Sequence, residues 1–190
     1  PNNMDPNNSS IQSILEQNTT NMIFYEDSFA KTSFFTKEIP NWEIPIFYFD
    51  FDLQYTGFVN AGITPSLKNL TMLYPENDSL REDLKSVIEK ISKTKSLVII
   101  DSLNGFFNLL EGKKDIGRLI NSFLMLLASS AKHTKSTVIL GVLSRLNDED
   151  KWVLYNTGRH VIDNEHFTKI QLTRSGNSIS TKVLNSDSAC

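Results

Sequence analysis

The run SLVIIDS at residues 96–102 constrains the fold of this chain more than any other stretch. Four consecutive β-forming residues with no polar alternation are typical of a parallel strand that is buried on both faces. Ligands of open parallel sheets bind at the carboxyl ends of the strands, so Asp101 stands where a carboxylate could hold Mg²⁺. The alternative is that Asp101 and Ser102 only cap the segment that follows, because Asp and Ser are good N-cap residues.

The rest of the chain alternates short apolar strands with amphipathic helices. Strands are expected at residues 22–25, 46–49, 70–74, 137–143 and 160–162. Helices are expected around residues 11–15, from residue 31, at 80–93 and at 116–132, with a loop or broken helix at 53–66. Residues 167–172 and 179–184 alternate around a turn at 174–177, which predicts an antiparallel hairpin. This order predicts an α/β fold: a mostly parallel central sheet flanked by helices, with a C-terminal antiparallel β-hairpin at its edge.

With 190 residues, of which 39% are hydrophobic, the chain is long enough for one well-buried domain. We expect this domain to span residues 11–184, between a disordered polar segment at 1–10 and a C-terminal tail at 185–190. The net charge of −3 does not support wholesale binding to a phosphate backbone, although a local basic patch stays open. The single cysteine, Cys190, and the lack of a signal peptide or of a ~20-residue apolar run predict a cytoplasmic protein without membrane contact.

The first predicted strand runs into YEDSFAKT at residues 25–32, which contains half of a phosphate-binding loop. The full pattern is G-x-x-x-x-G-K-[ST], and Lys31 and Thr32 stand at its lysine and hydroxyl positions. Tyr25 and Ala30 stand at the two glycine positions, where a Cβ penalises the positive φ that an anion-binding nest needs. The two acidic residues between them also oppose phosphate binding. A chance Lys-Thr at the start of a helix is the alternative interpretation.

The order of elements resembles the core of the RecA/RadA/KaiC ATPase superfamily over residues 11–184. The segments that carry the resemblance are MIFYEDSFAKTSFF, IFYFDFD, LREDLKSVIEKISKTKSLVIIDSLNGFF, LINSFLMLLASSAKHTKSTVILGVLS and FTKIQLTRSGN, of which LVIIDSLNGFF is the most specific. The resemblance implies a RecA-like fold with a Walker B strand and a degenerate Walker A loop. It implies Mg²⁺ and ATP as cofactors if the site works, and no cofactor if it does not.

The resemblance also implies roles for residues at the nucleotide site. Asp101 matches the Walker B aspartate and, with the Thr32 hydroxyl, would hold Mg²⁺, while Lys31 and Thr32 would bind the nucleotide. Asp52 falls where the family places the glutamate that polarises the attacking water. Because aspartate is one methylene shorter, the water would sit farther from its base, which weakens the case for hydrolysis. Asp52 capping a turn is the alternative.

Three further residues match positions near the edge of the nucleotide site. Ser144 lies about where a polar nucleotide sensor ends the fifth strand of the family. Lys169 and Arg174 lie in the hairpin, where KaiC-like rings supply basic residues that act across a subunit interface. The alternatives are an exposed hydroxyl for Ser144 and solvated strand positions for Lys169 and Arg174.

Several functions follow as hypotheses. The missing glycines, acidic loop and shortened acid favour a degenerate RecA-like protein that has lost efficient ATP hydrolysis. It would be a structural or regulatory subunit of a homo- or hetero-oligomer with RecA-like paralogues, as in recombination-mediator complexes or the ring of Elongator accessory subunits. A divergent but active Mg-dependent ATPase is the second hypothesis. A DNA- or RNA-binding module is the third, with Lys113, Lys114, Arg118, Lys132, Lys135 and Arg145 as the basic residues. An α/β domain whose motifs arose by drift is the last alternative.

Overall fold

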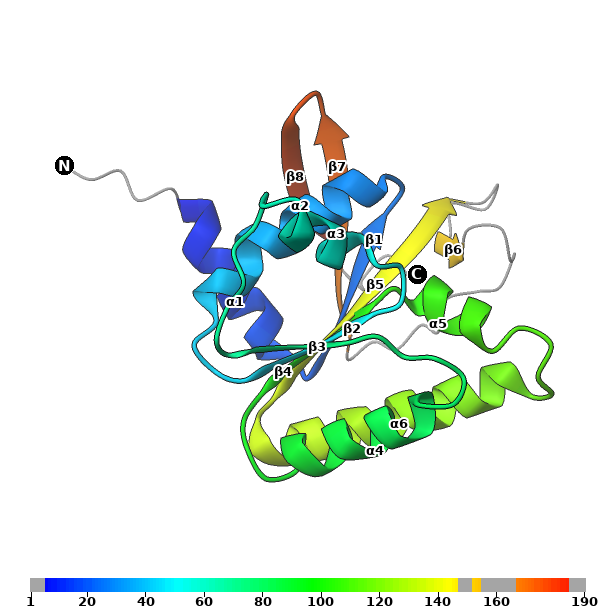
Figure 1. Ribbon diagram of the computed structural model, residues 1–190. Coiled ribbons are helices and arrows are strands. Elements are labelled where there is room, and N and C mark those ends of the chain that lie inside the picture. Colours follow the sequence, from blue (N-terminus) through cyan, green and yellow to red (C-terminus); the bar gives the residue numbers. More distant parts are fainter. Residues whose placement is uncertain (1–5, 147–151, 155–166, 185–190) are drawn as a thin grey trace, which may run out of the picture.

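The computed structural model describes residues 6–146, 152–154 and 167–184, and a mixed sheet forms its centre (Figure 1). Seven strands follow the order β3-β2-β4-β5-β1-β7-β8, and β6 pairs antiparallel with β5. Neighbours from β3 to β7 are parallel, and β8 pairs antiparallel with β7 at the edge. The strands are β1 (Thr20–Tyr25), β2 (Ile46–Asp50), β3 (Leu70–Leu73), β4 (Leu97–Asp101), β5 (Thr137–Leu146), β6 (Trp152–Leu154), β7 (Thr168–Ser175) and β8 (Ser178–Leu184). The predicted mostly parallel sheet with a hairpin at its edge is confirmed.

Helices cover both faces of this sheet (Figure 1). Side chains of α1 and α2 pack into one apolar layer, and those of α4, α5 and α6 pack into the other. The helices are α1 (Pro6–Gln17), α2 (Ser28–Glu38), α3 (Gln54–Asn60), α4 (Leu80–Ile91), α5 (Leu103–Leu109) and α6 (Ile116–Thr134), with a 3₁₀ turn η1 (Ile39–Asn41) after α2.

The apolar run of β4 lies in the middle of the sheet, as its composition predicts. Every residue of β4 is buried. Val98 and Ile100 belong to the layer under α4 and α6, and Ile99 belongs to the layer under α1 and α2. Because side chains of a strand alternate between its faces, a strand covered on both sides needs apolar residues at successive positions.

Several boundaries differ from those expected. Helix α1 begins at Pro6, so residues 6–10 are helical where disorder was predicted. Helix α2 begins at Ser28, three residues before the expected start, and α3 forms within the segment 53–66. Helix α5 and strand β6 were not predicted. The strand expected at 160–162 lies outside the described residues.

Among the described helices, none has the length and apolar character needed to cross a bilayer.

Candidate functional site

The carboxyl ends of β1, β2 and β4 bring the sequence-predicted residues to one edge of the sheet. Asp50, the last residue of β2, is the register partner of Asp101, the last residue of β4. Strand β1 ends at Tyr25 and leads through two residues into α2, which carries Lys31. This is the edge at which parallel sheets place their ligands.

Lys31 and Asp101, the predicted phosphate and Mg²⁺ ligands, pair with each other. Lys31 Nζ donates hydrogen bonds to Asp101 Oδ1 and to Gln54 Oε1, each at 2.6 Å. The side chains of Lys31 and Asp101 are both 0% exposed. Tyr48 donates its phenolic hydrogen to the other carboxylate oxygen of Asp101. Asp52 Oδ2 lies 3.8 Å from the ammonium and completes a ring of acceptors around it.

The surroundings of this ion pair are aromatic and buried. The Tyr25 ring lies with its centroid 5.3 Å from Lys31 Nζ, within the range of a cation–π contact. Burial raises the pKa of the Tyr25 and Tyr48 phenols, so both stay protonated. Burial also raises the pKa of Asp101 to about 6, although the Lys31 ammonium acts to lower it.

The raised pKa of Asp101, about 6, gives the stability of the fold a defined pH dependence. The folded state holds this proton more tightly than the unfolded chain, so the contribution is fully present below about pH 4 and is lost as the pH rises through about 6. We expect the free energy of unfolding to fall over this window by on the order of 2 kcal/mol more in the native protein than in Asp101→Asn. Urea unfolding of both proteins at several pH values checks this. Parallel pH profiles would contradict it.

A carboxylate of the chain itself occupies the start of α2, where a phosphate-binding loop would hold its anion. Asp27 is the N-cap, and its Oδ1 accepts hydrogen bonds from the amides of Phe29 at 2.7 Å and Ala30 at 3.3 Å. The Lys31 amide donates to the Asp27 carbonyl at 3.2 Å. Helix N-termini bind anions through these free amides. The Asp27 carboxylate therefore occupies the amides that would otherwise bind a phosphate.

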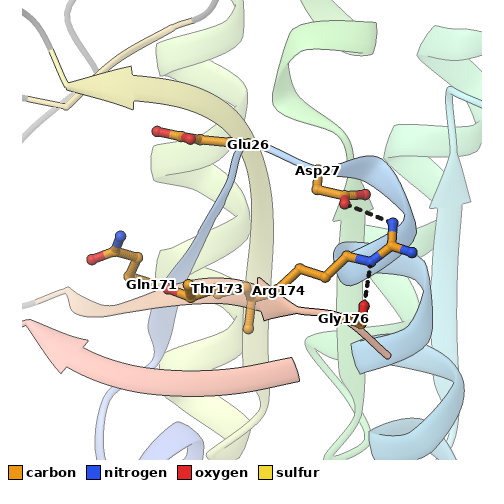
Figure 2. Close-up of a pocket in the computed structure, with 7 residues that line it drawn as sticks. Glu26, Asp27, Gln171, Thr173, Arg174 and Gly176 are labelled. Carbon is orange, nitrogen blue, oxygen red and sulfur yellow. Dashed lines mark hydrogen bonds and ion pairs between the residues drawn. The ribbon is translucent and has the colours of Figure 1, made fainter. Parts of the chain in front are cut away.

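Arg174 ties the β7–β8 hairpin to this capping carboxylate. Figure 2 shows its guanidinium reaching Asp27, where Nη1 lies 2.9 Å from Oδ2, while Nε donates to the Gly176 carbonyl at 2.9 Å. Its Cζ lies 4.5 Å from the centroid of the Phe29 ring. The Arg174 hydrogen bond lowers the pKa of Asp27. A pocket of about 480 Å³ opens beside this pair, lined by Glu26, Asp27, Gln171, Leu172, Thr173, Arg174 and Gly176.

The Asp27 cap of α2 is expected to contribute more to stability than the ion pair between Asp27 and Arg174. Asp27→Ala should lower the free energy of unfolding by about 0.5–2 kcal/mol, because the first amides of α2 lose their acceptor. Asp27→Asn, which keeps an acceptor, should cost clearly less. Arg174→Met should cost no more than about 1 kcal/mol, because a half-exposed ion pair is weak. Thermal and urea unfolding of the three variants give the ranking, and a larger loss in Arg174→Met than in Asp27→Ala would contradict it.

The structure brings Thr32 and Asp52 to the ion pair between Lys31 and Asp101. Thr32 is buried and its hydroxyl donates to the Ser28 carbonyl at 3.0 Å. Asp52 is 26% exposed beside Lys31. Ser144 is buried rather than exposed, and its Oγ has no hydrogen-bond partner among the described residues. Lys169 is half-buried, in register with Met22 of β1. For Lys169 and Arg174 the role across a subunit interface stays a prediction.

Three residues that contribute to the site were not predicted from the sequence. Tyr48 lies inside β2, and Gln54 opens α3 in a segment interpreted as a loop or broken helix. Asn104 bonds both backbone groups of Leu143, with its Nδ2 3.0 Å from the carbonyl and its Oδ1 2.8 Å from the amide, so it holds α5 against the end of β5. In the sequence, the one indication of this role was a polar residue, Asn104, between Leu103 and Gly105.

The residues of this edge do not fit Mg-ATP in the arrangement described. The Lys31 ammonium is shared between Asp101 and Gln54, and the amides at the start of α2 are bonded to Asp27. The Asp101 carboxylate is fully buried against Lys31 and Tyr48, which leaves no free oxygen facing solvent. In the described part of the chain, no group of three or more His, Cys, Asp or Glu side chains could hold a metal ion.

Comparison of sequences identifies no relative: no protein-family model and no curated protein matches the chain. Comparison of structures does. The crystal structure of the RadB recombinase matches with a TM-score of 0.58 at 12% sequence identity, covering 87% of this chain and 80% of that chain. The predicted RecA-like fold is thereby confirmed. At this identity the likeness establishes the fold alone, and the function has to be argued from the site.

Proposed function

We propose that this chain is a degenerate RecA-like protein that does not hydrolyse ATP and acts as a structural or regulatory subunit of an oligomeric assembly. Recombination-mediator complexes and the ring of Elongator accessory subunits are assemblies of this type. The observation that carries the proposal is the buried ion pair between Lys31 Nζ and Asp101 Oδ1 at 2.6 Å. In a working site this lysine would be free for phosphate, and this aspartate for Mg²⁺.

Two internal carboxylates compete with a nucleotide for the same groups. A phosphate would have to displace Asp101 from Lys31 and Asp27 from the first amides of α2. Both carboxylates are tethered, so they bind without the loss of translational freedom that a free nucleotide suffers. Binding would also break the buried Lys31–Asp101 ion pair, so the new contacts of phosphate and Mg²⁺ would have to replace its attraction before they could add affinity. These terms favour a site that stays closed to ATP.

A phosphate-release assay on the purified chain with Mg-ATP tests the proposal. We expect release no faster than in buffer without protein. The variant Asp52→Asn separates genuine turnover from a contaminating ATPase, because Asp52 is the predicted base and its partial exposure makes the change mild for folding. Turnover that Asp52→Asn abolishes would refute the proposal and establish the alternative, a divergent but active ATPase.

A further inference from the structure

The amino ends of β4 and β5 bring two charged segments together, at the edge of the sheet opposite to the candidate site. One segment is residues 89–96, from the end of α4 to β4, and the other is residues 131–136, from the end of α6 to β5. Thr134 Oγ1 donates to the Ile91 carbonyl at 2.7 Å and joins them. Figure 1 shows both helices ending where these two strands begin. We call the two segments together the amino-end patch.

The amino-end patch is strongly basic in a chain whose net charge is −3. It contains five lysines and a single acidic residue, and all six of these side chains are exposed: Lys90, Lys93, Lys95, Lys132, Lys135 and Glu89. The carboxyl ends of β1, β2 and β4 and the turns after them are mostly acidic instead, with Glu26, Asp27, Asp50, Asp52 and Asp101. The fold therefore separates positive from negative charge between the two edges of its sheet.

Contacts within the fold account for three of the five lysines. Lys90 Nζ lies 5.6 Å from the centroid of the Phe47 ring, and Lys93 Nζ lies 3.5 Å from Glu89 Oε1. Lys132 lies in the last turn of α6, where the helix dipole favours a cation. Among the described residues, the other two lysines of the patch have no ion pair.

These two lysines, Lys95 and Lys135, stand at neighbouring strand entrances. Each precedes by two residues a member of the register pair Leu97 and Thr137. The Thr137 amide donates to the Ser96 carbonyl at 3.0 Å, so the two entrances are in direct contact. Like charges at neighbouring positions of a sheet are unfavourable for the fold. The pair is therefore better explained by an anion that binds from outside.

The backbone of Lys135 gives a second, independent indication. Its φ of 58° lies in the left-handed region, and it closes α6 as the C-cap. Glycine is favoured in this conformation, because a Cβ is penalised there. The side chain is exposed, so it does not repay that cost by packing in the core. A lysine at this position is consistent with a role for its charge in binding.

A phosphate backbone fits the amino-end patch better than an acidic protein segment or a membrane surface. The exposed large apolar side chains of the described residues all lie outside the patch. It therefore offers no apolar anchor for a partner helix or a lipid surface, and no aromatic face on which unpaired bases could stack. Lysines bind the phosphates of a duplex through charge, without such anchors.

We infer that the amino-end patch binds the phosphate backbone of a nucleic-acid duplex, with Lys95 and Lys135 each contacting a phosphate and Lys132 lying beside them. Phosphate contacts carry no sequence information, so this binding is independent of sequence. The other basic cluster, Lys113 and Lys114, precedes the opposite end of α6, a 19-residue helix that rises about 28 Å. The inference goes beyond the proposed function and holds whether or not the chain binds ATP.

Fluorescence anisotropy with a labelled DNA duplex and an RNA duplex of the same sequence, each about 20 base pairs long, tests the inference at about 50 mM KCl. We expect a dissociation constant of about 1–100 µM for at least one duplex. Lys95→Glu/Lys135→Glu should weaken this binding at least about tenfold. The matched control, Lys113→Glu/Lys114→Glu, changes the net charge equally at the other end of α6 and should stay within about twofold of the native protein.

A second variant separates the charge of Lys135 from any structural role. Lys135→Gly supplies the residue that the left-handed backbone favours, so the melting temperature should stay unchanged or rise. Binding should nevertheless weaken. The slope of log affinity against log KCl for the DNA duplex should become shallower by about 0.9, the value of one lost phosphate contact.

Three results would overturn the inference. The first is no binding of either duplex at protein concentrations up to about 0.1 mM, while thermal unfolding shows that the protein is folded. The second is equal weakening by Lys95→Glu/Lys135→Glu and by Lys113→Glu/Lys114→Glu, which would assign binding to the overall charge. The third is tighter binding of a single strand or of poly-glutamate than of both duplexes, which would assign the patch to unpaired bases or to an acidic protein.

Discussion

Replacing Lys31 with methionine is expected to lower the free energy of unfolding by about 3–5 kcal/mol, because it leaves a buried carboxylate without its cationic partner. Lys31 and Asp101 are both fully buried and 2.6 Å apart. Methionine fills a similar volume, so the loss is one of charge pairing rather than of packing. Equilibrium unfolding in urea at neutral pH, followed by far-ultraviolet circular dichroism, measures the change.

Two further variants make this result specific. Lys37→Met changes an exposed lysine of the same helix and should be within about 0.5 kcal/mol of the native protein. Lys31→Met/Asp101→Asn should recover part of the loss, because the Tyr48 hydroxyl can still donate to the amide oxygen while no unpaired charge remains. A change in Lys31→Met as small as that in Lys37→Met would mean that Lys31 is free, as in an open phosphate-binding loop.

Gly105→Ala should be the second most damaging single change, at about 1–3 kcal/mol. A Cβ at residue 105 would lie 2.4 Å from Asp52 Oδ1 and 2.7 Å from the Cβ of Phe51. The Asp52 carboxylate can rotate away, but the Phe51 Cβ moves only with its backbone. We therefore expect the turn after β2 to shift, together with the Asp52 side chain beside Lys31. Urea unfolding gives the stability loss.

Gly117 provides the matched control for this substitution. It also lies within a helix, but a Cβ there would meet nothing within 4 Å. In a helix interior, alanine is more stable than glycine by about 0.8–1.0 kcal/mol, so Gly117→Ala should be neutral or stabilising. A destabilisation in Gly117→Ala equal to that in Gly105→Ala would show that the close approach of α5 to the turn after β2 is not the cause.

The fold was predictable because its central strands carry strong periodic signals. The run that forms β4 is typical of a strand covered on both faces, and the amphipathic spacing predicted a helix over 80–93, where α4 forms. Helix α5 was not predicted because its sequence, LNGFFNL, is short and contains a glycine. Helix α2 began earlier than expected because Asp27 acts as its N-cap.

The candidate site was predictable in its location but not in its connections. Motif spacing placed Lys31 and Asp101 at one edge of the sheet, and the acidic residues of the loop pointed to weak phosphate binding. Pairing between Lys31 and Asp101 depends on the rotamers of both side chains and on the aromatic residues around them, which no local pattern encodes. Tyr48 and Gln54 come from separate elements and meet the pair only in the folded chain.

Thermal unfolding of the full chain with and without Mg-ATP tests most directly whether this site is closed to nucleotide. A site with a dissociation constant near 50 µM would gain about 2.7 kcal/mol at 5 mM nucleotide, which is a rise of about 5–10 °C for a domain of this size. We predict a rise below about 1 °C, no different from that with MgCl₂ at equal ionic strength. A rise of several degrees with Mg-ATP alone would contradict the account, because Lys31 and Asp101 would then have separated to bind it.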